Sequence, residues 1–182
     1  MAGIRPQELL NLKRKKPLLE TIVGKRGRGK TTLAKQLLQD RQALGQADQV
    51  FILDYLGEYS KFSSRTVYIQ NIGLKSFCHK VWDESGPKKS TLVLFDEIDL
   101  YGKDDFRIAH LYKFGRHKNI DIIAVARRFY DLPVIVRALT DEFHLFQITE
   151  ERDLSYLRRI VSESILQNLI NLKPFRYINV SI

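Results

Sequence analysis

The sequence predicts an α/β fold with a mainly parallel central sheet flanked by helices. Strand-like and helix-like segments alternate along the chain, which is typical of a parallel sheet covered on both faces. Several strand-like segments are apolar without alternation, as expected for strands buried on both faces. A glycine-rich loop, GKRGRGKTT at residues 24–32, joins the first strand to the first helix.

The predicted elements follow one another in order along the chain. Strands are expected over residues 18–23, 50–54, 66–69, 92–95, 120–125, 142–147 and 176–180. Helices are expected over residues 31–44, 75–82, 105–116, 133–139, 150–161 and 162–169. In the first helix, Leu33, Ala34, Leu37 and Leu38 fall on one face, and Gly45 follows as a stop signal.

Length and composition predict one domain over residues 1–182, with a basic N-terminal arm at 1–17 and a C-terminal helix and strand at 162–182. The apolar runs are too short to span a bilayer, and the N-terminus has no signal-peptide core. We therefore expect no membrane-spanning segment. Cys78 is the single cysteine, so an internal disulfide is excluded, and the four histidines have no zinc-site spacing.

The net charge of +9 and pI of about 9.7 favour a polyanionic partner, nucleic acid before membrane. A phosphate-binding site would account for part of this excess. The basic run at residues 13–16 is either a solvated arm or a contact to DNA phosphates or to a capsid shell. The sequence leaves these alternatives open.

The glycine-rich loop matches the P-loop spacing G-x-x-x-x-G-K-[ST]. Its glycines allow successive backbone N–H groups to form a concave nest for phosphate at a helix N-terminus. Lys30 is expected to reach the β- and γ-phosphates of ATP, and the Thr31 hydroxyl to bind Mg²⁺. The predicted nucleotide-binding residues are Gly24, Lys25, Arg26, Gly27, Arg28, Gly29, Lys30, Thr31 and Thr32.

A second motif, TLVLFDE at residues 91–97, is a buried strand followed by two acids, as in a Walker B motif. Asp96 is expected to hold the Mg²⁺ shell, and Glu97 to act as the general base for the attacking water. Asp99 is a possible second acid, a helix cap or a surface group. Because a nucleotide kinase must exclude water, the adjacent Glu97 favours ATP hydrolysis.

Two further stretches resemble the HerA/FtsK superfamily of P-loop NTPases. FILDYLGEYS is similar to its second-strand motif, in which a strand ends in Asp54 and Gly57, Glu58 and Tyr59 follow. Residues 115–157 are similar to its C-terminal half. By size, the closest subgroup is the genome-packaging ATPases of viruses with double jelly-roll capsids. The resemblance covers about residues 18–161 and implies a RecA-like fold of the HerA/FtsK type.

The resemblance also implies roles for arginines. Arg116, at the end of a predicted helix, matches the superfamily's trans-acting finger, although a helix-terminal arginine is also favoured by the macrodipole. Arg127 occupies the sensor position, where these proteins usually carry Gln. Arginine cannot accept a hydrogen bond from water, but it can donate to the γ-phosphate or reach a neighbouring subunit. Arg127 and Arg128 are the next candidate fingers.

Three basic residues inside the P-loop, Lys25, Arg26 and Arg28, depart from relatives that carry small residues there. They either screen the triphosphate or pair with acids across a subunit boundary. Lysines and an arginine in two further loops are candidates for DNA contact: Lys88, Lys89, Lys103 and Arg107.

The function implied is an ATPase ring motor that translocates double-stranded DNA into a viral capsid. Its expected partners are DNA, further copies in a pentameric or hexameric ring, and capsid vertex proteins, in the host cytoplasm or the virion. The alternatives are a cellular HerA- or FtsK-like DNA pump and an ATP-dependent assembly switch without translocation. A small-molecule kinase fits less well, because residues 83–90 do not resemble an arginine-rich lid.

Overall fold

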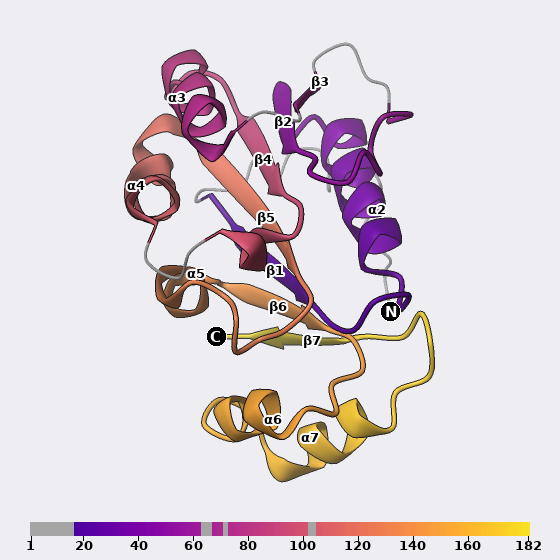
Figure 1. Cartoon of the computed structure of the whole chain (residues 1–182). Helices are drawn as coiled ribbons and strands as arrows, with labels where there is room; N and C mark the ends of the chain where they lie inside the picture. Colours follow the sequence, from indigo (N-terminus) through magenta and orange to yellow (C-terminus); the bar gives the residue numbers. More distant parts are fainter. Residues whose placement is uncertain (1–16, 63–66, 71–72, 102–104) are drawn as a thin grey trace, which may run out of the picture.

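A seven-stranded sheet forms the centre of the protein, with helices on both faces (Figure 1). The computed structural model describes residues 17–62, 67–70, 73–101 and 105–182. The strand order is β3-β2-β4-β5-β1-β6-β7. Six strands are parallel, and β7 pairs antiparallel with β6. The strands are β1 (Leu19–Val23), β2 (Gln49–Leu53), β3 (Val67–Gln70), β4 (Thr91–Phe95), β5 (Ile120–Ala126), β6 (Glu142–Leu145) and β7 (Ile178–Ser181).

The predicted mainly parallel α/β fold is confirmed, including the burial of its central strands. Every residue of β2 and β4 is buried, and β5 is buried except for Asp121. This explains why these segments are apolar without alternation. The C-terminal ends of β4, β5 and β1 lie side by side because these strands are neighbours, so the loops that follow them meet at one edge of the sheet.

The helices are α2 (Lys30–Ala43), α3 (Leu74–Glu84), α4 (Phe106–Phe114), α5 (Val134–Leu139), α6 (Glu151–Leu157) and α7 (Glu163–Ile170), with 3₁₀ turns η1 (Ile98–Leu100) and η2 (Gly115–Lys118). The prediction of one helix over residues 105–116 was wrong. The α-helix ends at Phe114, and Arg116 lies in η2. This turn is closed by Asn119 in the left-handed conformation, at φ 53°. Three parts of the predictions lie outside the described residues: residue 66 of the predicted strand 66–69, Lys103, and residues 1–16 of the predicted arm.

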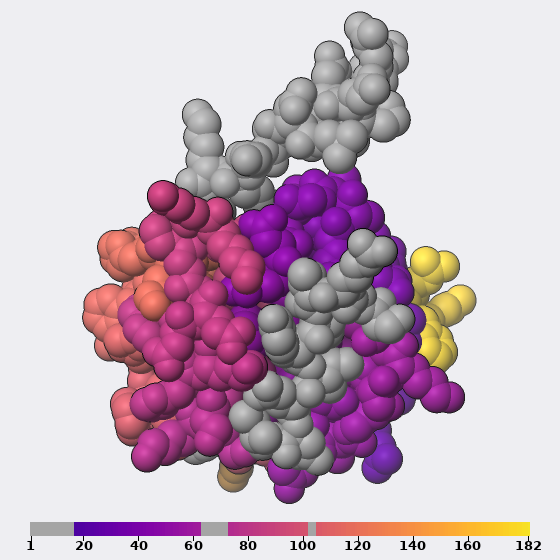
Figure 2. Space-filling model, turned by 90° about the horizontal axis from the view of Figure 1, so that it is seen from above, coloured from indigo at the N-terminus to yellow at the C-terminus, as the bar shows by residue number. Residues whose placement is uncertain are grey.

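Two hydrophobic clusters fill the space between the sheet and its helices. In β4, Leu92 and Leu94 pack with the α2 side, whereas Val93 and Phe95 pack with the α3 and α4 side. This alternation is the two-residue period of a strand. In Figure 2, seen from above, the magenta surface around α3 lies beside the purple surface of the N-terminal third of the chain, and the yellow C-terminal segment lies at the edge of the molecule.

A buried charge network ties α2 to the sheet. Arg41 forms ion pairs with Glu20 of β1 and with Asp121 of β5, the latter at 2.7 Å. His144 of β6 contacts Glu20 through Nε2 at 3.3 Å and Asn179 of β7 through Nδ1 at 2.8 Å. The network therefore links four strands and a helix through side chains far apart in sequence. None of these residues was singled out by the sequence as part of such a network.

Among the described residues, none of the helices is both long enough and apolar enough to cross a membrane.

Replacing Arg41 with Ala should lower the free energy of unfolding by about 3–5 kcal/mol, because two carboxylates would lose their buried cation. Chemical denaturation measures this difference. Arg158→Ala is the matched control, since Arg158 is exposed and its ion-pair partner Glu151 is exposed as well. Equal unfolding midpoints for the two variants would contradict a stabilising role of the network.

Candidate active site

The P-loop connects β1 to α2, and its glycines are required by its backbone. Gly27 and Gly29 have φ of 74° and 103°, where residues with a side chain are strained. A Cβ on Gly24 would lie 2.5 Å from Cβ of Phe146, so a larger residue does not fit there. Gly29 immediately precedes α2, and the loop therefore ends at the helix N-terminus, where free N–H groups attract anions.

Lys30 is the first residue of α2, and its side chain folds back onto the loop. Its Nζ donates a hydrogen bond to the carbonyl oxygen of Lys25 at 3.2 Å. Burial lowers the pKa of Lys30, and the opposing effect of four nearby carboxylates is smaller. These carboxylates belong to Glu97, Asp99, Asp96 and Glu58. The lysine is therefore a buried cation surrounded by acids.

Glu58 reaches the start of α2 from the segment that follows β2. Its Oε2 accepts a hydrogen bond from the Thr31 hydroxyl at 2.7 Å, and its carbonyl accepts one from Lys35 Nζ at 2.6 Å. The buried Asp54 carboxylate fixes this segment by accepting bonds from the N–H groups of Glu58 and Tyr59, at 3.0 and 2.9 Å. The motif that carried the resemblance thus places a carboxylate on the P-loop threonine.

The sequence analysis used Glu58 for recognition and missed its contact with Thr31. The signal that could have found it is the spacing from Asp54. A carboxylate at a strand end commonly binds backbone N–H groups a few residues further on, which turns the chain back over the site.

Asp96 follows β4 and is 1% exposed. Its Oδ2 has no hydrogen-bond partner within the described part of the chain. Burial, together with the smaller effects of the nearby Glu97, Glu58 and Asp54, raises the pKa of Asp96 to about 7 against the opposing effect of Lys30. Carboxylate and hydroxyl oxygens are the donors that Mg²⁺ prefers. The unpartnered Asp96 oxygen and the Thr31 hydroxyl therefore fit a Mg²⁺ ion.

Glu97 has an uncommon backbone conformation, with φ 51°. Its Oε2 lies 2.7 Å from Nε of Arg127, and the same Nε is 3.3 Å from Oδ2 of Asp99. Burial raises the pKa of Glu97, Asp99 raises it next, and Arg127 opposes both. The predicted base and the predicted sensor arginine are therefore brought together, with the arginine holding the carboxylate.

The site opens into a cavity of about 620 Å³, within the size range of small-ligand pockets. Its lining residues come from the P-loop, the segment after β2, the end of β4, the end of β5 and the segment before β7: Arg26, Gly27, Gly29, Lys30, Thr31, Thr32, Tyr55, Leu56, Glu58, Glu97, Leu100, Arg127 and Phe175.

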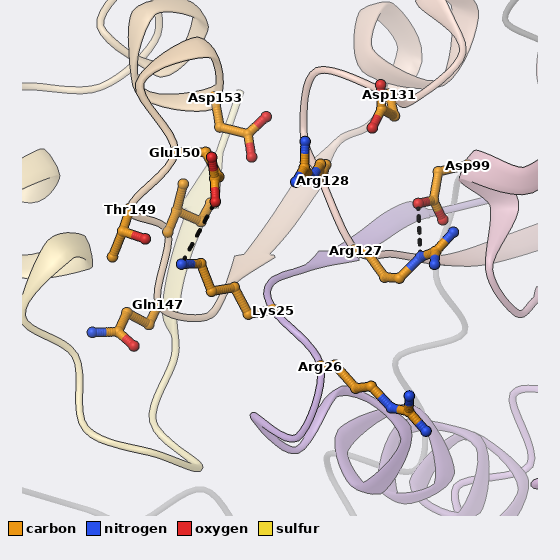
Figure 3. A pocket seen from close by; sticks show the side chains of 11 residues that line it. Lys25, Arg26, Asp99, Arg127, Arg128, Asp131, Gln147, Thr149, Glu150 and Asp153 are labelled. Carbon is orange, nitrogen blue, oxygen red and sulfur yellow. Dashed lines mark hydrogen bonds and ion pairs between the residues drawn. The ribbon is translucent and has the colours of Figure 1, made fainter.

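A neighbouring cavity of about 620 Å³ shares Arg26 and Arg127 with the first (Figure 3). In it, Lys25 points toward Glu150 of the same chain, with Nζ 3.7 Å from Oε1. Arg128 also lines this cavity. Lys25 thus has an acidic partner within its own chain, which neither alternative for the P-loop cations included. Of the other two, Arg26 lines both cavities and Arg28 bonds the C-terminal segment through its backbone.

Arg116 lies away from this site. It borders a cavity formed at the N-terminal ends of β1 and β5, with Leu19 and Ile120. The P-loop, Asp96 and Arg127 follow the C-terminal ends of their strands. Arg116 is therefore at the opposite edge of the sheet from Lys30.

Two of the candidate DNA-contact residues, Lys89 and Arg107, also lie apart from the cavity. Lys89 belongs to a turn bridged to Gly86, just before β4, and Arg107 pairs with Asp105 at the start of α4.

No protein-family model matches the sequence, and no curated protein matches it. Solved structures do match. The genome packaging NTPase B204 from Sulfolobus turreted icosahedral virus 2, in complex with AMP, has a TM-score of 0.76 and 22% identity, over 91% of this chain and 92% of that one. B204 from Sulfolobus turreted icosahedral virus, a DNA-packaging ATPase, has a TM-score of 0.73 and 21% identity, over 89% and 91%.

EssC (ATPases 2 and 3) from Geobacillus thermodenitrificans has a TM-score of 0.65 and 15% identity, over 89% of this chain and 37% of that one. These likenesses confirm the predicted fold: the chain has the P-loop NTPase fold of viral packaging NTPases and of EssC.

The acid cluster should make stability fall with pH. Because the pKa of Asp96 is about 7 in the folded protein, against an ordinary value of 3.8, the unfolded chain loses this proton first as pH rises. The free energy of unfolding should therefore decrease between about pH 4 and 7 and stay low above that range. Asp96→Asn removes this contribution.

We expect Asp96→Asn to melt at a higher temperature than the wild type at pH 8, without added nucleotide or Mg²⁺, and the difference to shrink as pH falls toward 4. Thermal unfolding at four or five pH values checks this. A difference in melting temperature that does not vary with pH would contradict the assignment.

Proposed function

We propose that the protein is an ATP-hydrolysing ring motor that translocates double-stranded DNA and packages a viral genome into a capsid. The observation that carries the hydrolytic part is the convergence of Lys30, Thr31, Asp96 and Glu97 at one edge of the sheet. The fold of viral packaging NTPases and the net charge of +9 support DNA as the partner.

In this proposal the backbone nest of the P-loop binds the phosphates of ATP. Lys30 neutralises negative charge on the transferred phosphoryl group, which favours its charged form despite burial. Thr31 and Asp96 hold Mg²⁺, which when bound polarises the phosphate oxygens. Glu97 orients the attacking water and accepts its proton, for which its raised pKa is suitable.

Arg127 would couple the base to the nucleotide. Its guanidinium pairs with Glu97 and Asp99, and a γ-phosphate offers more negative charge to the same donor. When Arg127 turns to the phosphate, Glu97 is released to bind water. The arginine at the sensor position would then make the base available only in a pocket that contains a triphosphate.

The position of Arg116 relative to the P-loop supports a ring. The exposed Arg116 is at the sheet edge opposite the P-loop, so a head-to-tail contact would bring one copy's Arg116 to the next copy's nucleotide. Contacts between two different surfaces close into rings when the rotation permits. The partners are then further copies, in a pentamer or hexamer, with DNA and capsid vertex proteins, in the host cytoplasm or the virion. Lys88, Lys89 and Arg107 remain candidates for DNA contact.

Glu97→Gln should retain ATP binding and slow hydrolysis by about 10²–10⁴-fold, the usual contribution of a positioned general base. The amide preserves size and polarity but cannot accept the proton. Steady-state phosphate release and equilibrium binding separate the two effects. If the variant turned over ATP normally, the base would have to be another residue, and Asp99 would be tested next.

The shared site predicts rescue between two inactive variants. Arg116→Ala should bind ATP normally and lose up to about 10³-fold in hydrolysis, as when an arginine finger is removed. Mixed with Glu97→Gln, it should regain part of the activity. Some interfaces then join an intact Glu97 pocket to an intact Arg116.

The two variants should be mixed over a range of ratios at a concentration where mixed rings are shown to assemble. Two defects in a self-contained active site cannot complement each other in this way. Absence of recovery at every ratio would exclude Arg116 as a finger acting between subunits, and Arg128 would be tested in the same assay.

A further inference from the structure

The chain between α7 and β7 returns to the P-loop. Within this segment, Phe175 donates a backbone hydrogen bond to the carbonyl oxygen of Arg28 at 3.1 Å. In Figure 1 the yellow segment that precedes β7 rises beside the start of α2. A segment almost 150 residues away in sequence from the P-loop is thus held directly against it by the two backbones.

The Phe175 side chain is unfavourable for folding in two respects. Its φ of 61° lies in the left-handed region, which is strained for a bulky residue. The residue is also 68% exposed, so most of its apolar surface remains in water. Folding alone does not explain a strained and exposed phenylalanine, and such outliers concentrate at ligand sites.

The ring lies directly on the phosphate-binding loop. A Cβ on Gly29 would be 2.8 Å from Cδ1 of Phe175, which shows how closely the ring covers the glycine. Phe175 lines the same cavity as Lys30, Thr31 and Thr32. Beneath the loop, Phe146 would be 3.6 Å from the same Cβ, and its ring lies 5.4 Å from that of Tyr177. Two further aromatic residues, Phe146 and Tyr177, therefore lie near the glycine that the exposed ring covers.

The lining of the cavity combines two kinds of chemistry. Glu97 and Arg127 supply charges where the terminal phosphate would react, whereas Phe175 supplies a flat apolar surface. A nucleoside triphosphate combines the same two chemistries, a chain of charged phosphates and a flat base. Stacking on an aromatic ring suits any base, because every base has a π-face.

We propose that Phe175 is the platform on which the nucleotide base stacks, and that it selects nucleotides over free polyphosphate without distinguishing adenine from guanine. This inference rests on the proposed function, since it takes the P-loop ligand to be a nucleoside triphosphate. The larger purines gain more from stacking than the pyrimidines. The protein is thereby assigned a preference for purine nucleotides.

The test compares ATP with inorganic tripolyphosphate, which shares the phosphates and lacks the base. Titration calorimetry with Mg²⁺ gives both dissociation constants. Phe175→Gly removes the ring and suits the left-handed backbone, so the variant should fold at least as well as the wild type. We expect its Kd for ATP to rise about tenfold, within the range for loss of one base–aromatic stack, and its Kd for tripolyphosphate to stay unchanged.

Two variants accompany it. Phe175→Trp keeps a flat ring and should bind ATP about as well as the wild type. Phe106→Gly is the matched control, because Phe106 is also an exposed phenylalanine, at 75%, but borders a different cavity beside α3 and α4. It should leave both dissociation constants unchanged.

Three results with the variants would overturn the inference. ATP affinity in Phe175→Gly equal to that of the wild type would show that the base does not touch the ring. An equal loss for ATP and tripolyphosphate would show that Phe175 only shapes the loop. A loss of ATP affinity in Tyr55→Ala but not in Phe175→Gly would place the base against the segment after β2, which lines the same cavity.

If the wild type bound neither ATP nor tripolyphosphate, the proposed function would fail, and this inference with it. Binding of tripolyphosphate and ATP with equal affinity by the wild type would overturn the stacking platform alone. The two failures are therefore distinguishable in one set of titrations.

Discussion

The burial of one lysine among four carboxylates is the constraint on which the rest of the site depends. Lys30 lies with Glu58, Asp96, Glu97 and Asp99, and negative charge exceeds positive charge in a partly buried space. Such an excess is unfavourable unless cations offset it. The lowered pKa of Lys30 and the raised pKa values of Asp96 and Glu97 are consequences of this arrangement. It is suited to receive a divalent cation together with a phosphate chain.

The sheet supplies this constraint through its strand order. Because β4, β5 and β1 are neighbours, the acids after β4, the arginine after β5 and the P-loop after β1 meet at one edge. Two segments from outside this group complete the site: the turn held by Asp54 brings Glu58 to Thr31, and the chain before β7 brings Phe175 to Gly29. Arg116 lies at the opposite edge of the same sheet, and the proposed head-to-tail ring makes use of this position.

Local patterns in the sequence predicted the parallel fold and the P-loop geometry, because glycine spacing and apolar strands act over a few residues. The sequence did not predict the contacts made over long separations. Arg41 meets Glu20 and Asp121 across the sheet, and Arg127 pairs with the expected base rather than standing free. Nor could the strain at Phe175 be found, since a positive φ leaves no signal at a non-glycine residue. The α-helix expected through Arg116 ends at Phe114 instead, and a 3₁₀ turn closed by Asn119 follows, because the exact end of a helix depends on its surroundings as well as on its sequence.

The central claim is that this edge of the sheet hydrolyses ATP in order to move DNA. The most direct measurement is the ATP hydrolysis rate of the wild type and of Lys30→Ala, each with and without double-stranded DNA, at two salt concentrations. The account predicts hydrolysis by the wild type that DNA stimulates, stimulation that weakens as salt rises because phosphate contacts release counterions, and no hydrolysis by the variant. Equal turnover by both proteins, or a wild-type rate indifferent to DNA, would contradict it.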